Sequence, residues 1–289
     1  MVALIHELSN PPSIALMQSM RSQALDLRAQ DVEAQWRIDE HHRLTLLALR
    51  GLQSPLSPQD INNVAYANEA ADLEVMSHKW YRFIIKLWPA ASAWVNDVRD
   101  VRVSFASAFP ETFHVAKRPP HCDDLFSYDE ISLYWTTLER WSGDAAKELA
   151  PGGRQFTALL GVVHHAVQDF YCHSNWVYLY HDVFPEAVKV PTWQEVHNPD
   201  WAKADPIRRG RFLERIRQSN RWVMTEGCWT SDVRRSGGLQ TGSYNMPFTE
   251  DGLSPWKHRH PDEGTFEHLL AYEVSVRATV EATKRLLQL

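Results

Sequence analysis

Apolar side chains recur at helical spacing along most of the chain. Between Gln23 and Leu52, for example, apolar residues such as Val32 and Trp36 return at intervals near four, as on one face of an amphipathic helix. Ser57 is a suitable capping residue for a second helix, which Pro58 would open at its first position. The same pattern predicts helices over 58–84, 89–101, 128–149, 155–180, 206–225 and 265–287.

Signals for β-strands are almost absent. No alternating apolar run is bounded by an Asn-Gly or Asp-Gly turn. Three irregular segments, 104–127, 182–205 and 229–264, separate the helices, and irregular segments of this length are usually functional. The predicted fold is therefore all-α. An N-terminal extension, 1–22, precedes one multi-helix metal-binding domain, 23–289, whose long irregular loops close over a site between helices.

The composition narrows the class of protein. With 44% hydrophobic residues, the chain has the apolar content of a folded globular protein rather than of a disordered one. The formal net charge of −6 argues against a surface that binds polynucleotide phosphates nonspecifically. We therefore expect no stable nucleic-acid binding. The three cysteines include no CxxC pair and give no basis for a disulfide framework.

The ends and the apolar runs bear on localisation. The first residues, 1–13, lack the basic and apolar regions of a secretory signal. No stretch approaches roughly 20 uninterrupted apolar residues, the length that crosses a bilayer. We expect a cytoplasmic protein, and export by a route without a cleavable signal stays open. The sequence indicates no oligomeric state.

The segment 159–179 carries the strongest chemical signal. It spaces His165, Asp169 and His173 four residues apart, among mostly apolar neighbours. On a helix this spacing puts imidazole, carboxylate and imidazole on one face. Such groups cannot be buried without hydrogen bonds or a cation, and a divalent metal is the simplest partner because His and Asp are ordinary zinc ligands. A buried hydrogen-bonded network without metal is the alternative.

A second polar stripe adjoins the first on the same predicted helix. His164 and Gln168 form it, again four residues apart. We interpret Gln168 as a hydrogen-bonding partner that orients a metal ligand rather than as a ligand itself.

The segment 164–177, HHAVQDFYCHSNWV, resembles the signature of the Het-C family, whose usual form is close to HTVQDFYSHSNWV. That family, named for a fungal heterokaryon-incompatibility protein, is similar to the zinc-dependent phospholipases C and the single-strand-specific zinc nucleases. Those enzymes are all-α proteins that hold three zinc ions, with an HxxxD helix at the centre. This chain departs from the signature at His164, an added histidine, and at Cys172, which replaces a serine.

Other segments resemble family elements in the same order along the chain. They are HHRLT (41–45), AYANEAADLE (65–74), PHCDDLF (120–126), GLQTGSYN (238–245) and, more loosely, KHRHPDEG (257–264). Together with the central helix and a histidine on the last helix, the resemblance implies these metal ligands: His42, Asp72, His121, Asp123, His165, Asp169, His173, His260, Asp262 and His268.

The resemblance also implies roles for these residues. Asp169 would bridge two metals. Independently of the resemblance, an unligated carboxylate, Asp123 or Asp124, could serve as a general base if the metal-bound water is not already ionised. The remaining ligands would complete two or three zinc sites, with Asn68 one helical turn before Asp72 as a further candidate.

Simpler interpretations stand beside these assignments. His41 and His42 follow acidic residues and suit a solvated helix face, and His121 with Asp123 suits an ordinary turn after two prolines. The segment 258–262 suits a charged surface loop.

The chemistry that the resemblance implies is phosphodiester hydrolysis. Zinc ions polarise phosphoryl oxygens and activate water, so no serine or cysteine nucleophile is required. The leading expectation is a zinc-dependent phosphodiesterase of phospholipase C type that cleaves a phospholipid head-group ester, with peripheral membrane contact. The alternatives are a single-strand nuclease-like phosphodiesterase, and a non-catalytic Het-C-like interaction or toxin protein with structural metal.

Overall fold

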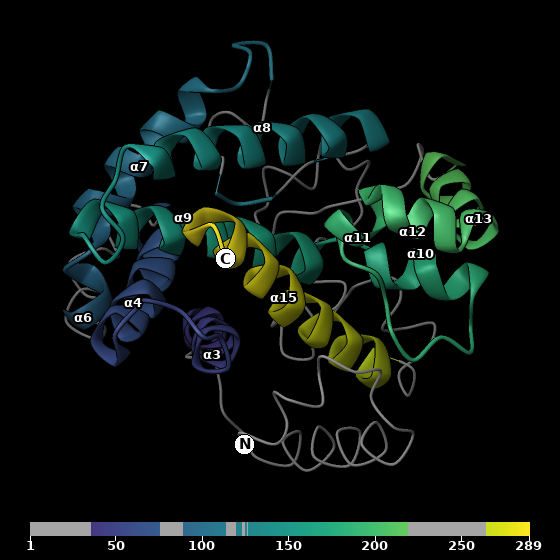
Figure 1. Ribbon diagram of the computed structural model, residues 1–289, viewed down its shortest axis with the longest axis horizontal. Helices are drawn as coiled ribbons and strands as arrows, with labels where there is room; N and C mark the ends of the chain where they lie inside the picture. The colour runs from purple at the N-terminus through teal and green to yellow at the C-terminus, as the bar shows by residue number, and fades with distance from the viewer. Residues whose placement is uncertain (1–35, 76–88, 114–119, 123–124, 126, 219–263) are drawn as a thin grey trace. The chain divides into compact units, whose positions relative to one another are not determined.

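The computed structural model describes residues 36–75, 89–113, 120–122, 125, 127–218 and 264–289 (Figure 1). These residues form eleven helices, and the described part of the chain contains no strand, which confirms the predicted all-α class. None of the described helices combines the length and the apolar character that crossing a membrane requires. The helices are α3 (Trp36–Arg50), α4 (Pro58–Val75), α6 (Pro89–Ser92), α7 (Val95–Ser107), α8 (Tyr128–Lys147), α9 (Arg154–His173), α10 (Trp176–Val183), α11 (Trp193–His197), α12 (Pro199–Ala204), α13 (Pro206–Gln218) and α15 (Gly264–Leu287).

Two differences from the predicted helices concern short-range signals. The segment predicted as one helix, 155–180, is two helices that are separated at Ser174 and Asn175, residues whose side chains compete for backbone hydrogen bonds. The segment predicted as irregular, 182–205, contains the short helices α11 and α12. The predicted extension, 1–22, and most of the loop 229–264 lie outside the described residues.

Helix starts follow a recurring pattern of a capping residue and then proline. At α4, Ser57 Oγ accepts from the Asp60 amide at 3.2 Å, and the Ser57 amide donates back to the Asp60 carboxylate at 2.9 Å. This reciprocal cap satisfies two amides that the first helical turn leaves open, and it confirms the start predicted at Ser57 and Pro58. Asn198 before Pro199 caps α12 with its side-chain oxygen, which accepts from the Asp200 amide at 2.8 Å.

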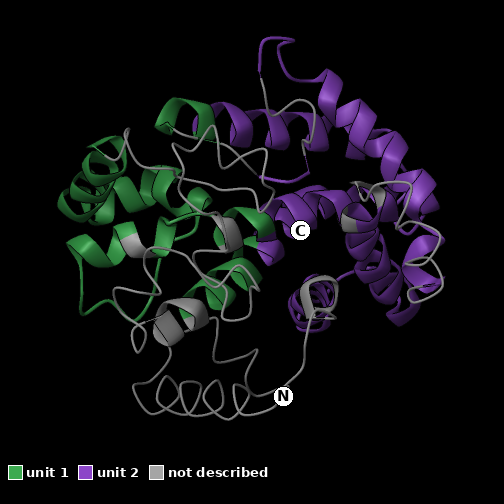
Figure 2. Cartoon of the chain, turned by 180° about the vertical axis from the view of Figure 1, so that it is seen from behind, with its two compact units in different colours: residues 1–34, 123–131, 169–278 green, residues 35–122, 132–168, 279–289 purple. Residues whose placement is uncertain are grey.

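The chain divides into two compact units, 1–34 with 123–131 and 169–278, and 35–122 with 132–168 and 279–289 (Figure 2). The second of these holds α3, α4, α6 and α7, with α4 in contact with each of the other three. Gly161 on α9 lets that helix approach α4 closely, because a Cβ there would lie 2.5 Å from the Ala67 Cβ. Phe105, Phe109 and Tyr134 form an aromatic core within this unit.

The first unit has a different interior. Trp176 on α10 packs edge-on against Phe212 of α13, and its indole N–H donates to the Pro191 carbonyl at 2.8 Å. Arg277 lies in an ionic network with Glu195, at 2.7 Å, and with Glu273. Paired charges and aromatic rings thus fill the interior of this unit.

Candidate metal centre

Helix α9 is a core helix that carries polar side chains. Every residue from Phe156 to Tyr171 is buried. Among them His164, His165 and Gln168 have no exposed surface, and Asp169 is 2% exposed. Groups of this kind are buried only with partners that satisfy them, so the surroundings of α9 reveal what the helix is built to hold.

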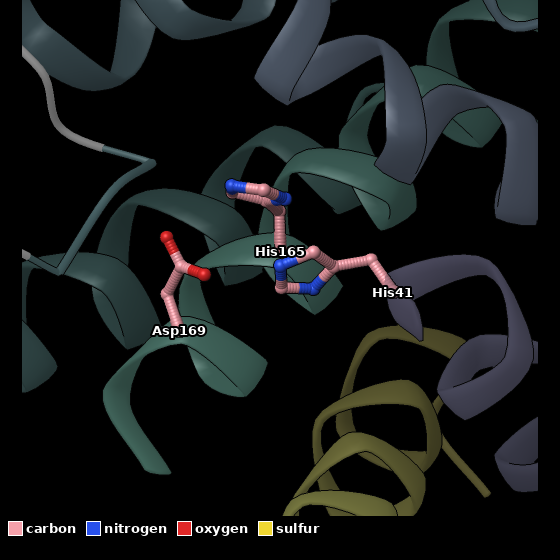
Figure 3. Close-up of side chains that lie close together, drawn as sticks. All are labelled: His41, His165 and Asp169. Carbon is pink, nitrogen blue, oxygen red and sulfur yellow. The ribbon is translucent and has the colours of Figure 1, made fainter. Parts of the chain in front are cut away.

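Three of these buried side chains converge. One ligand atom each from His41, His165 and Asp169 lie within 4.8 Å of one another (Figure 3). His165 and Asp169 project from successive turns of α9, and His41 reaches toward them from α3. The four-residue spacing on α9 therefore does bring imidazole and carboxylate together, and a second helix supplies another imidazole.

A third histidine adjoins this group. His121 Nδ1 lies 3.1 Å from His165 Nε2, and the two rings are nearly perpendicular at 85°. Two nitrogens that each bind a tetrahedral zinc at about 2.0–2.1 Å are about 3.3 Å apart. The spacing of His121 and His165 is therefore close to that of neighbouring ligands on one ion. His121 is 7% exposed.

Two amide side chains connect the histidines. Asn68 Oδ1 is 3.0 Å from His165 Nδ1, and Gln168 Oε1 is 2.9 Å from His41 Nδ1. The amides also bond to each other, with Asn68 Nδ2 donating to Gln168 Oε1 at 2.9 Å. Thr45 Oγ1 accepts from both amides, at 2.8 and 3.1 Å. Gln168 thus lies within hydrogen-bond distance of a histidine of the buried group, as its predicted orienting role requires.

His164 faces a different partner. Its Nε2 lies 2.8 Å from Thr283 Oγ1, and that hydroxyl donates to the Thr279 carbonyl at 2.8 Å. Because the Thr283 hydroxyl hydrogen is already used, His164 Nε2 must be the donor. Complete burial lowers the pKa of His164 to about 3, so this imidazole is neutral at ordinary pH. The added histidine of the 164–177 signature is therefore a structural residue.

His42 points elsewhere. Its Nδ1 lies 3.0 Å from Glu69 Oε1, its side chain is 18% exposed, and its ring packs near Tyr66 at 4.9 Å. The histidine that joins the buried group is His41, which sequence reasoning missed. Both histidines are followed at helical spacing by core residues, Leu44 and Ala48 for His41 and Thr45 and Leu49 for His42, so the sequence does not distinguish them.

The structure brings three of the predicted ligands together: His121, His165 and Asp169. The side chains of Asp72 on α4, His173 on α9 and His268 on α15 are outside the described part of the structure. Asp123, His260 and Asp262 also lie outside the described residues. Their assignment as ligands, and that of Asp123 as a base, stays a prediction.

Comparisons of the chain with protein-family models, with curated proteins and with solved structures find no match. The support for a metal centre therefore comes from its donor atoms. Two imidazoles, a carboxylate and an adjacent third imidazole are an ordinary zinc donor set. Their burial, their separations and the hydrogen bonds behind them fit a bound cation.

Proposed function

We propose that the protein is a zinc-dependent phosphodiesterase of phospholipase C type, which hydrolyses the ester of a phospholipid head group. The observation that supports this proposal most directly is the buried group of His41, His165 and Asp169, with His121 adjacent. The choice of a phosphodiester substrate rests on the resemblance of 164–177 to the Het-C signature.

Each residue has a role in this proposal. His41 and His165 hold the ion through neutral imidazoles, and Asp169 adds the negative charge that offsets part of the charge of the cation. His121 would be a further ligand of the same ion or a ligand of a second metal site. A bound zinc ion would supply Lewis acidity toward a phosphoryl oxygen and would activate water. The protein contributes fixed donors in a dry setting, which strengthens their electrostatic effect.

The depth of the centre favours one alternative, a non-catalytic protein with structural metal. His165 and Asp169 are 0% and 2% exposed, and His41 is 6% exposed. Structural zinc sites are closed, whereas catalytic sites keep one position open to water or substrate. In this alternative the ion would stabilise the fold and an interaction surface would carry the function.

The test is elemental analysis of the purified full chain after dialysis, followed by assays on phosphatidylcholine and on single-stranded DNA. Retained zinc with release of a phosphorylated head group supports the proposal. Zinc without hydrolysis of either substrate favours the structural alternative, and cleavage of DNA alone favours the nuclease. Absence of stoichiometric metal in both the wild type and a zinc-supplemented sample overturns all three.

A matched control separates the centre from the remaining histidines. His165→Gln should lose zinc, whereas His181→Gln should keep it, because His181 bonds through Nε2 to the Ala187 carbonyl. Equal zinc content in these two variants would contradict the assignment of His165.

A further inference from the structure

The orientation of the Asn68 amide is fixed by its neighbours. Its Nδ2 faces Thr45 Oγ1 at 2.8 Å, Gln168 at 2.9 Å and the His41 carbonyl oxygen at 3.5 Å. A carbonyl oxygen can only accept a hydrogen bond, so the amide NH₂ must be on this side. The Asn68 oxygen is then left facing His165 Nδ1 at 3.0 Å.

The orientation of the Gln168 amide follows from that of Asn68. Because Asn68 Nδ2 donates to it, the atom of Gln168 at 2.9 Å must be the oxygen. The Gln168 Nε2 group then faces two hydroxyls, Thr45 Oγ1 at 3.1 Å and Thr279 Oγ1 at 3.3 Å, both of which can accept. The same Gln168 oxygen lies 2.9 Å from His41 Nδ1. All four of these polar contacts of the Gln168 amide are consistent with this single orientation.

These two amide oxygens determine which ring nitrogen carries the proton. An amide oxygen accepts only, so His165 Nδ1 and His41 Nδ1 must both donate. In a neutral imidazole the other nitrogen then carries the lone pair. His165 Nε2 presents this lone pair next to His121, and the His41 ring lies beside the His165 ring, with centroids 4.4 Å apart.

We infer that Asn68 and Gln168 are positioning residues that fix His165 and His41 as Nδ1–H tautomers, so that both bind a cation through Nε2. The role of these tautomers in metal binding rests on the proposed metal centre, but the tautomers themselves exist with or without a metal. Partners that hold the distal N–H of a metal-binding histidine typically contribute about 10–100-fold to metal affinity. Here neutral amides supply that support instead of the more usual carboxylates.

The first measurement uses nuclear magnetic resonance and does not depend on activity. Long-range proton–nitrogen correlations of the full chain, with ¹⁵N-labelled histidine and without metal, distinguish Nδ1–H from Nε2–H rings. His41→Gln and His165→Gln variants assign the two signals. We expect both rings to be Nδ1–H at pH 8. An Nε2–H ring at either position in the wild type would overturn the inference for that residue.

The second measurement tests whether Asn68 acts through the ring of His165. Asn68→Ala should allow the Nε2–H tautomer of His165 and weaken zinc binding by about 10–100-fold, measured by competition with a chromophoric chelator. Asn68→Asp keeps an acceptor for the Nδ1–H group of His165, so it should retain that tautomer, but it removes the donor to the Gln168 oxygen, so its zinc affinity should recover only in part. Asn63→Ala, on the same helix but bonded to Gln59, should leave both properties unchanged.

These outcomes separate the inference from the proposed function. Nδ1–H tautomers that shift in Asn68→Ala would uphold the inference for a chain that binds no zinc, and would leave only the metal proposal wrong. Conversely, wild-type zinc affinity in Asn68→Ala would overturn the positioning role while the metal centre stands.

Discussion

The two compact units bury polar groups in opposite ways. In the unit that contains α3 and α4, the buried network around α9 consists of neutral side chains: His41, Thr45, Asn68, His165 and Gln168. In the other unit, the guanidinium of Arg277 lies with two carboxylates, Glu195 and Glu273. The neutral network contains imidazole nitrogens, which can bind a cation, whereas the ionic network neutralises its charges internally.

The ionic network is built to keep its charge. Burial alone would lower the pKa of Arg277, but the adjacent Glu273 and Glu195 carboxylates outweigh this effect and raise it above its ordinary value. For Glu195, burial raises the pKa, and Arg277, the Thr192 amide and Lys189 together lower it below its usual range. Buried charges that satisfy one another have no need of a ligand, so the Arg277 network has a structural role.

The largest effect on zinc content is expected from alanine substitution of one of two adjacent histidines, His41 and His42. His41→Ala should remove a zinc ligand and reduce the zinc content of the purified chain to near background. His42→Ala should leave the content unchanged, because the imidazole of His42 lies against Glu69. Elemental analysis of the two variants decides between His41, which the structure places in the cluster, and His42, which the family resemblance implies. Zinc loss in His42→Ala alone would favour the resemblance.

The sequence predicted the wrong one of two adjacent histidines, His42 instead of His41, as a member of the buried group, and this error shows which features local patterns can predict. Caps such as Ser57 before Pro58 were predictable because their chemistry is local, and α9 was predictable because its apolar period is long. The choice between adjacent histidines depends on which of them meets Gln168, 127 residues away from His41. No local pattern carries that information.

The short helices were missed for a related reason. Helices α11 and α12 have five and six residues, too few for a helical period to repeat. Their caps are nevertheless legible, because Thr192 and Glu195 form a reciprocal capping box. A search for caps, rather than for apolar period, would have found α11. Gln168 was predictable as a polar neighbour of the histidines from its place beside His165, but the hydrogen bond of Asn68 with His165 was not.

Removing Arg277 should cause the largest loss of stability. Arg277→Met leaves Glu273, whose side chain is 3% exposed, without its cation. Breaking a buried pair in this way costs about 3–5 kcal/mol. Hydrogen–deuterium exchange should show faster exchange in α11 and in the half of α15 that precedes residue 279, while zinc content is retained.

The same substitution at Arg215 is the control. Arg215 pairs with Asp182 at 2.6 Å, but both side chains are partly exposed, at 29% and 37%. The loss there should stay below about 1 kcal/mol. Equal effects of the two substitutions would mean that the Arg277 network contributes no more than a surface ion pair.

Gly161 on α9 connects the packing of α9 against α4 with the neutral network around Asn68 and His165. A Cβ at Gly161 would lie 2.5 Å from the Ala67 Cβ and 2.8 Å from the Asn68 amide nitrogen. Gly161→Ala must therefore push α9 and α4 apart, at a cost of about 1–3 kcal/mol in unfolding free energy, and move Asn68 away from His165. Zinc affinity should fall together with stability. Gly143 on α8 is the contrast, because a Cβ added there would meet no atom within 4 Å beyond its own helix backbone and chain neighbours. Gly143→Ala should therefore raise the unfolding free energy by about 0.5–1 kcal/mol.

The buried imidazole of His164 should make the fold less stable in acid. In the unfolded chain a histidine titrates near ~6.5, whereas burial holds the pKa of His164 at about 3. Between these values the unfolded state binds more protons, so stability falls as pH is lowered, by at most about 1.4 kcal/mol per pH unit from this residue. His164→Leu should therefore lose less stability between pH 6.5 and 5 than the wild type does, in urea unfolding at each pH.

Thr283→Val separates burial from hydrogen bonding as the cause of that slope. The variant keeps the His164 imidazole buried but removes the hydroxyl that lies 2.8 Å from its Nε2. It should lose about 1–3 kcal/mol at every pH, because a buried N–H is left without an acceptor, and its acid slope should match the wild type. If Thr283→Val flattened the slope as His164→Leu does, the hydrogen bond would be the cause, because burial of the ring is common to wild type and Thr283→Val.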